Sequence, residues 1–447
     1  MADQAGRPDD KRRVMRRLLF ALAPLLVLLA AATLILSQLE KRRVVITERP
    51  DDSVMHRPVN LLERVQTDQG EMFRLSGYNI RSATFPVQKA ENTGRIVLAG
   101  ESFVLGIPYR WPDSRDFGFG DIPNWVQTEL EWRFPARRFE VINAGAKSRN
   151  SSGVREIVEA LLPVEPDAVV VATGNNEGYI PVTAFNEIAH RWVVYRLLKK
   201  ELLPEPELNE RPYMMVQNPD SAALRANFER NIRAMARAAK EKNVRLVLCT
   251  MPINLRYQQP HLAVNDDIIR QGHEMYAQGR YQQAIEVFSR SARQAAAAKL
   301  IGDCLYALGE YEHAKIMYQI SVEMDPQNRT RPSLNEIVRR VSREENTALA
   351  DLAQAIDEQS PHGIADVNLF CDYCHMTWRG YYLAAREITR VLVERRLVGA
   401  GRDKPRPPPT AEEMIARRHW EILFNPAAQP GGCIAPPTAF GPAPAAQ

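Results

Sequence analysis

Residues 95–102, Arg-Ile-Val-Leu-Ala-Gly-Glu-Ser, are the segment from which the fold of this chain can be inferred. A short apolar run stops at Gly100, and Ser102 follows two positions later. This pattern is typical of a buried strand that ends at the carboxyl edge of a parallel sheet, where open α/β sheets bind ligands. A serine after a glycine is more often a turn or capping residue, so the segment alone is a weak signal. It predicts Ser102 at an exposed sheet edge.

Three further polar clusters follow apolar runs or lie in a loop. Residues 139–143 lead into Gly145, and residues 167–172 lead into residues 173–177, Thr-Gly-Asn-Asn-Glu. Near the end, residues 371–375 read Cys-Asp-Tyr-Cys-His. Because the carboxyl ends of parallel strands meet at one edge of a sheet, we expect these clusters to lie close together.

Strands and helices are expected to alternate along the chain. Two more strands are predicted at residues 244–250 and 347–352, and amphipathic helices at residues 124–133, 220–242 and 377–395. This order predicts an α/β fold with a doubly wound parallel sheet.

The four clusters, in this order, resemble the conserved blocks of the SGNH (GDSL-type) hydrolase family. The matching residues are Gly100-Glu101-Ser102, Gly145, Gly174-Asn175-Asn176-Glu177 and the segment from Asp372 to His375. Glu101 and Glu177 stand where aspartate is commoner, and both keep the carboxylate. The resemblance covers roughly residues 91–261 and 346–395, and it implies a flavodoxin-like fold of three layers.

The resemblance also implies the site residues. Ser102 would be the nucleophile, His375 its base, and Asp372 the carboxylate that orients the histidine. The oxyanion hole would consist of the amides of Ser102 and Gly145 and the side-chain nitrogen of Asn176. No metal or cofactor is required. The alternatives are a strand-end turn for Gly145 and an Asx-type turn for Asn176.

The Cys371 to His375 segment has two other interpretations. Cys-x-x-Cys-His is the attachment pattern for c-type haem, and a haem would take His375 as an iron ligand. A disulfide between Cys371 and Cys374 is a third option.

An esterase acting through an acyl-enzyme is the predicted function, with an envelope carbohydrate or lipid ester as substrate. An O-acyltransferase would use the same site with a sugar hydroxyl as acceptor. A scaffold with a degenerate hydrolase fold, and the haem protein, are the remaining alternatives. The net charge of +4 comes partly from one N-terminal basic cluster, so no nucleic-acid partner is expected.

Residues 18–36 contain no charged side chain and are long enough to span the hydrocarbon of a bilayer as a helix. Six basic residues precede this stretch, which places the amino end in the cytoplasm and the rest of the chain outside, in the periplasm of a bacterium. A cleaved signal peptide is the alternative, because residues 30–32 are alanines.

A 30-residue repeat interrupts the hydrolase pattern. Gly272-x6-Gly279-x-Tyr281 recurs as Gly302-x6-Gly309-x-Tyr311, and each unit is predicted to form two helices similar to a tetratricopeptide repeat. Two units are too few to stand alone, so we expect them to pack on the hydrolase body; a protein partner for them is left open.

These patterns divide the chain into seven segments. They are a cytoplasmic basic segment (1–17), a transmembrane helix (18–39), a stalk and lead-in (40–90), the first part of the hydrolase domain (91–261), the helical insertion (262–345), the second part of the hydrolase domain (346–399) and a Pro/Ala-rich tail (400–447).

Overall fold

The structure is a computed structural model of all 447 residues. It describes residues 61–77, 80–109, 120–177, 221–257, 267–291, 294–325, 329–398 and 404–418.

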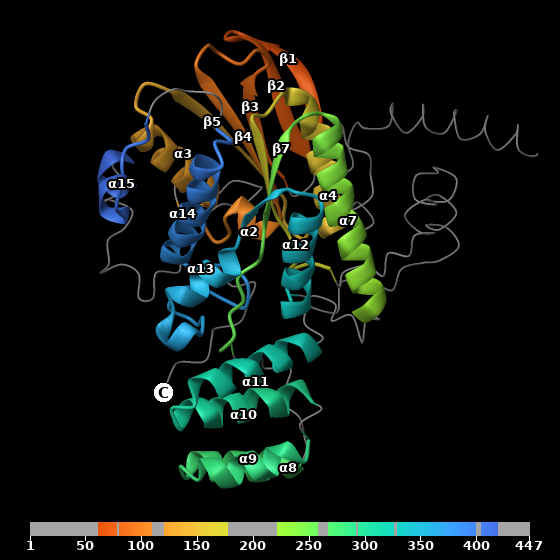
Figure 1. Ribbon diagram of the computed structural model, residues 1–447, viewed down its shortest axis with the longest axis vertical. Coiled ribbons are helices and arrows are strands. Elements are labelled where there is room, and N and C mark those ends of the chain that lie inside the picture. The colour runs from red at the N-terminus through yellow and green to blue at the C-terminus, as the bar shows by residue number, and fades with distance from the viewer. Residues whose placement is uncertain are drawn as a thin grey trace, which may run out of the picture. The chain divides into compact units, whose positions relative to one another are not determined.

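A five-stranded parallel sheet forms the centre of the α/β body (Figure 1). Its strands, in chain order, are β4 (Thr93–Gly100), β5 (Arg138–Gly145), β6 (Ala168–Ala172), β7 (Arg245–Cys249) and β8 (Ala348–Ala350). In the sheet they lie in the order β5-β4-β6-β7-β8, with every neighbouring pair parallel. The predicted parallel α/β sheet is therefore confirmed. The last strand is shorter than the predicted 347–352, because helix α13 (Leu352–Glu358) follows it closely.

The register of the sheet aligns the ends of the strands that carry the site. Gly100 of β4 lies beside Gly145 of β5 on one side and beside Ala172 of β6 on the other. The polar residues that follow these three strands therefore leave the sheet at the same edge.

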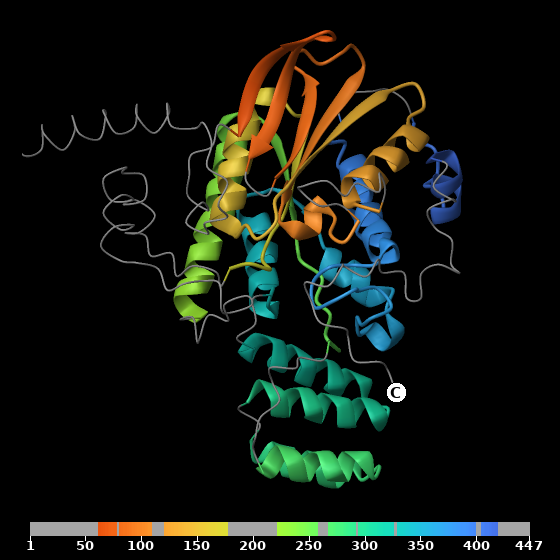
Figure 2. The same cartoon turned by 180° about the vertical axis from the view of Figure 1, so that it is seen from behind.

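Helices cover both faces of the sheet, which makes three layers. Trp125 of α3 and Tyr381 of α14 pack with Leu98 on one face, and Phe228 of α7 packs with Val97 on the other. Figure 2 shows the α4 and α7 pair and the α3 and α14 pair on opposite sides of the strands. The helix bounds are α2 (Ser102–Leu105), α3 (Ile122–Arg133), α4 (Ser151–Leu161), α7 (Ser221–Glu241), α12 (Pro332–Glu344), α13 (Leu352–Glu358), α14 (Trp378–Glu394) and α15 (Ala411–Arg418).

A second, antiparallel sheet occupies part of the region that the sequence predicts as a stalk. It consists of β1 (Leu62–Thr67), β2 (Gly70–Gly77) and β3 (Ile80–Pro86). Phe73 and Phe85 are buried and join the hydrophobic core on the α4 and α7 side. The sequence prediction missed this sheet because no residue of β1 is buried, which leaves only a weak alternation of apolar and polar positions.

Among the described residues of the predicted insertion (262–345), four helices form two consecutive pairs, and a fifth, α12, packs against α7 and the parallel sheet. The four paired helices are α8 (Asp267–Ala277), α9 (Tyr281–Ser289), α10 (Ala295–Ala307) and α11 (Tyr311–Met324), and each packs against the next along the chain. In both pairs the glycine of the first helix lies under an aromatic ring of the second, Gly272 under Phe288 and Gly302 under Tyr318. The helices lie where the repeats predict them; their likeness to tetratricopeptide repeats stays a prediction.

Several predictions fall on residues that the structure does not describe. They include the transmembrane helix (18–39) and the part of the tail (400–447) that follows Arg418. Within the described ranges, no helix is both long and apolar enough to cross a bilayer.

Candidate active site

Ser102 lies two residues after the end of β4 and begins the short helix α2. The chain can turn there because Gly100 and Gly145 have no side chain: a Cβ on Gly100 would lie 2.3 Å from the carbonyl oxygen of Ala172, and one on Gly145 would lie 2.1 Å from the amide nitrogen of Leu105. Glycine is therefore required at both positions by close backbone contact. Ser102 lies at the predicted sheet edge but is only 7% exposed, so the prediction that it is exposed is wrong.

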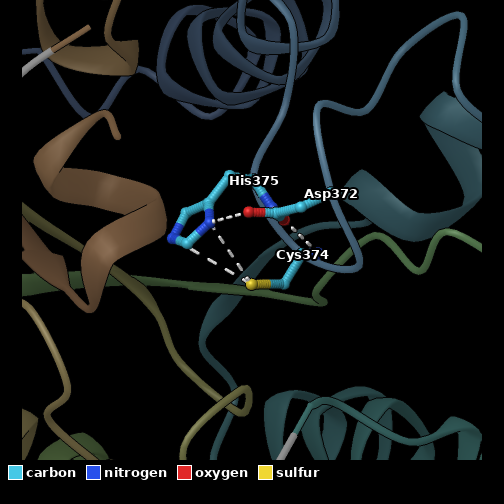
Figure 3. Close-up of side chains that lie close together, drawn as sticks. All are labelled: Asp372, Cys374 and His375. Atoms are coloured by element: carbon cyan, nitrogen blue, oxygen red, sulfur yellow. Dashed lines mark hydrogen bonds and ion pairs between the residues drawn. The ribbon is translucent and has the colours of Figure 1, made fainter. Parts of the chain in front are cut away.

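His375 connects Ser102 to Asp372. Its Nε2 lies 2.8 Å from Ser102 Oγ, although the two residues are 273 positions apart in the sequence. Its Nδ1 lies 2.6 Å from Asp372 Oδ2. Figure 3 shows the ring beside the Asp372 carboxylate, with both residues on one loop. The structure thus brings the three predicted catalytic residues into a continuous line of hydrogen-bonding distances.

The loop that carries Asp372 and His375 is closed at its base. Phe370 and Met376 form an antiparallel bridge, and the Cys371 amide donates to the His375 carbonyl oxygen at 2.8 Å. Helix α14 follows immediately, capped by Thr377, whose side chain accepts from the Gly380 amide.

Several donors hold the Asp372 carboxylate. Its Oδ1 accepts from the backbone amides of Cys374 at 2.8 Å and His375 at 2.6 Å, while Oδ2 faces the imidazole. Burial opposes the charged form, but the His375 charge and these hydrogen bonds outweigh it, so the pKa of Asp372 lies below its usual value. In addition, the Asn254 side chain donates to the Asp372 carbonyl oxygen at 2.9 Å. The carboxylate is therefore charged and fixed in one orientation.

Cys374 has a buried, free thiol beside the histidine (Figure 3). It therefore forms no disulfide with Cys371. Its sulfur lies 3.7 Å from His375 Nδ1, and ligand atoms of Asp372, Cys374 and His375 lie within 4.8 Å of one another, close enough to hold a metal ion. However, both ring nitrogens of His375 already have partners, Nδ1 at 2.6 Å from Asp372 Oδ2 and Nε2 at 2.8 Å from Ser102 Oγ. The residues fit a serine triad better than a metal or haem site.

Glu101 holds the turn after β6. Its Oε1 accepts from the Thr173 hydroxyl at 2.7 Å and the Gly174 amide at 2.6 Å, and its carboxylate also accepts from the Asn175 amide and from Asn176 Nδ2. The side chain is fully buried. Burial and the nearby charge of Glu177 raise the Glu101 pKa to about 8, despite the four donors.

Glu177 occupies a neighbouring buried position. Its carboxylate accepts from the Ser151 amide and hydroxyl, both at 2.7 Å, and Asn231 of α7 donates to the same hydroxyl. Burial raises the Glu177 pKa to about 7. The carboxylate thus ties the turn after β6 to the first residue of α4.

Two of the three predicted oxyanion donors, the Gly145 amide and Asn176 Nδ2, have acceptors within the protein. The Gly145 amide donates to the Asn143 side-chain oxygen at 3.0 Å. Asn176 Nδ2 donates to Glu101 Oε2 at 3.1 Å and to the Arg149 carbonyl oxygen at 3.0 Å. Both donors would have to exchange these bonds to reach an oxyanion.

Sequence reasoning missed Asn143 and Asn254. Asn143 precedes Gly145 by two residues, so the polar end of a buried strand could have indicated it. Nothing in the sequence indicates that Asn254 contacts Asp372, because the two are 118 positions apart.

No protein-family model and no curated protein matches this chain. Several solved structures are similar to it. A GDSL-like lipase from Bacteroides thetaiotaomicron is 12% identical, covering 69% of this chain and 92% of its own, with a TM-score of 0.34. An acetylxylan esterase from Geobacillus stearothermophilus is 13% identical, covering 70% and 98%, with a TM-score of 0.34. An acetyl xylan esterase named AlAXEase is 14% identical, covering 66% and 97%, with a TM-score of 0.34.

Proposed function

We propose that this chain is a serine esterase of SGNH type. The observation that carries the proposal is the line of contacts from Ser102 through His375 to Asp372, at 2.8 and 2.6 Å. A serine hydroxyl is a poor nucleophile until a base takes its proton, and a histidine is an effective base only when its other nitrogen carries a proton. Asp372 accepts a hydrogen bond from His375 Nδ1 and so keeps the proton on that nitrogen. Nε2 is then free to take the serine proton.

The reaction proceeds through an acyl-enzyme. Ser102 Oγ attacks the ester carbonyl carbon while its proton moves to His375 Nε2. The tetrahedral intermediate collapses, and the leaving alcohol takes the proton from Nε2. In the second step, His375 Nε2 takes a proton from a water molecule while the water oxygen attacks the acyl carbon. Ser102 Oγ then leaves with that proton, which releases the acid and restores the serine hydroxyl.

The negative oxygen of the intermediate needs donors. We assign this role to the amides of Ser102 and Gly145 and to Asn176 Nδ2. At the Gly145 amide, the oxyanion replaces the Asn143 side-chain oxygen as acceptor. At Asn176 Nδ2, it replaces one of the two acceptors, Glu101 Oε2 or the Arg149 carbonyl oxygen. A full negative charge is a stronger acceptor than a carbonyl oxygen. Apo sites often hold such donors in other bonds until substrate binds.

We further propose that a helix at residues 18–39 anchors the chain, with the hydrolase domain outside the cytoplasm. The charge-free stretch and the basic residues before it support this placement. Carbohydrate and lipid esters of an envelope are then the accessible substrates.

The function can be tested with short p-nitrophenyl esters. The full chain should release nitrophenol in a reaction that Ser102→Ala abolishes. Ser152→Ala is a matched control, because this buried hydroxyl lies in α4 and accepts from Asn231 at 2.9 Å. Equal rates for the wild type and Ser102→Ala would refute the proposal.

A further inference from the structure

Arg329 and Thr330, which follow the last repeat helix α11, contact the two segments that carry the proposed active site, Arg329 through Asn254 and Thr330 directly. We propose that Arg329 and Thr330 are positioning residues, through which the insertion holds the turn after β6 and the loop of Asp372 and His375 in their catalytic arrangement. This inference rests on the proposed function.

Thr330 contacts the turn after β6. Its backbone amide donates to Asn175 Oδ1 at 3.0 Å, and its hydroxyl oxygen would lie 2.8 Å from a Cβ on Gly174. The same turn is held from the other side by Glu101, which accepts from the Asn175 amide. The turn that presents Asn176 is thus fixed between the residue before the nucleophile and a residue from the insertion.

Arg329 contacts the other catalytic segment through Asn254. Its Nη1 donates to the Asn254 carbonyl oxygen at 3.3 Å, and the Asn254 side chain donates to the Asp372 carbonyl oxygen at 2.9 Å. On the insertion side, Arg329 Nη2 lies 3.1 Å from the carboxylate of Asp325, the residue that follows α11. A continuous path therefore runs from the end of the insertion to the backbone of the catalytic carboxylate.

The chemistry of this region argues against a purely stabilising role. Four polar atoms there are buried and have no hydrogen-bond partner within the described ranges: Asn175 Nδ2, Asn254 Oδ1, Arg329 Nε and Thr330 Oγ1. An unpaired buried polar group costs free energy, and a buried arginine costs more than an apolar side chain of its size. Destabilising features of this kind are found at functional sites, where the positions of catalytic groups matter more than the free energy of unfolding.

The central test combines Arg329→Lys with Asn254→Ala. Lysine keeps the positive charge beside Asp325. It lacks the planar guanidinium group, however, with which Arg329 contacts both the Asp325 carboxylate and the Asn254 carbonyl oxygen. Each variant should lower kcat about tenfold on a p-nitrophenyl ester, with KM within about twofold of the wild type. Because both act on Asp372 through one path, the double variant should lose little more than either single variant.

Arg331→Lys is the matched control. Arg331 is equally buried, lies two positions away, and donates to the Asp325 carbonyl oxygen on the insertion side. Its replacement should lower the melting temperature as much as Arg329→Lys does, but it should leave kcat nearly unchanged. Equal losses of kcat for the two arginine variants, or independent losses that multiply in the double variant, would overturn the inference.

A second readout does not depend on activity. In the full chain, the proton between His375 Nδ1 and Asp372 should give a far-downfield NMR signal, identified by its loss in His375→Ala. The signal should shift or broaden in Arg329→Lys and Asn254→Ala and should stay unchanged in Arg331→Lys. If the wild type hydrolyses no ester, the proposed function fails. An NMR signal that Arg329→Lys leaves unchanged would overturn the inference whether or not the protein hydrolyses an ester.

Discussion

Replacing Asp372 by asparagine should inactivate the protein without displacing the loop. Oδ1 accepts two backbone amides, so the asparagine must place its oxygen there, because the amide group would repel both donors. Its NH2 group then faces His375 Nδ1, 2.6 Å away in the wild type. The histidine responds by carrying its proton on Nε2, which faces Ser102, and it can no longer act as the base.

The expected magnitude follows from this change of tautomer. A wrong tautomer in a serine triad lowers kcat by about 10⁴-fold, which corresponds to about 5.5 kcal/mol of transition-state stabilisation. Initial rates on p-nitrophenyl acetate at saturating substrate give kcat directly. KM should change little, since Asp372 contacts the histidine and not the substrate.

Asp366→Asn is the matched control for this experiment. Asp366 is a buried carboxylate six positions upstream, and it accepts from the Asn368 amide and side chain, away from His375. It should retain most of the wild-type kcat. If Asp372→Asn also kept more than about a tenth of the wild-type kcat, the tautomer argument would be refuted.

Three further predictions follow from the region around Ser102. Gly145→Ala should lower the free energy of unfolding by about 1–3 kcal/mol or more in urea titrations, because the new methyl group would meet the Leu105 amide; an unchanged midpoint would contradict this. Asn176→Ala should lower kcat by about 10²–10³-fold, and an unchanged kcat would show that its amide stays bonded to the protein throughout the reaction. Glu101 and Glu177 have raised pKa values, so the folded state binds more protons than the unfolded state above about pH 4.5. The free energy of unfolding should therefore fall as pH rises from about 5 to 8, by up to about 1.4 kcal/mol per pH unit for each group, and Glu101→Gln should flatten the curve. A curve that rises with pH in wild type would contradict this.

The sequence was sufficient to predict the parallel sheet and the position of the candidate site. Ser102, Gly145 and Asn176 each follow an apolar run, and the parallel register places the ends of those runs side by side. Asp372 and His375 are three positions apart, so one loop can supply both groups.

The contacts that hold these residues could not be predicted. Glu101 bonds to a turn more than 70 positions away, and Arg329 bonds to Asn254 across 75 positions. Hydrophobic periodicity indicates which face of an element is buried, but it does not indicate which polar group meets which. Arg95 shows the same limit: at the start of a buried strand it is 1% exposed, paired with Glu140 and bonded to two carbonyl oxygens.

The most direct test of the proposed chemistry is covalent labelling of the full chain by a fluorophosphonate, followed by peptide mass spectrometry. An activated serine reacts, whereas ordinary hydroxyl groups do not. We predict one label per chain, located on Ser102, absent in Ser102→Ala and strongly slowed in His375→Ala. A chain that takes up no label, or labelling of Ser102 that is equally fast without the imidazole, would contradict the proposal that His375 activates this serine.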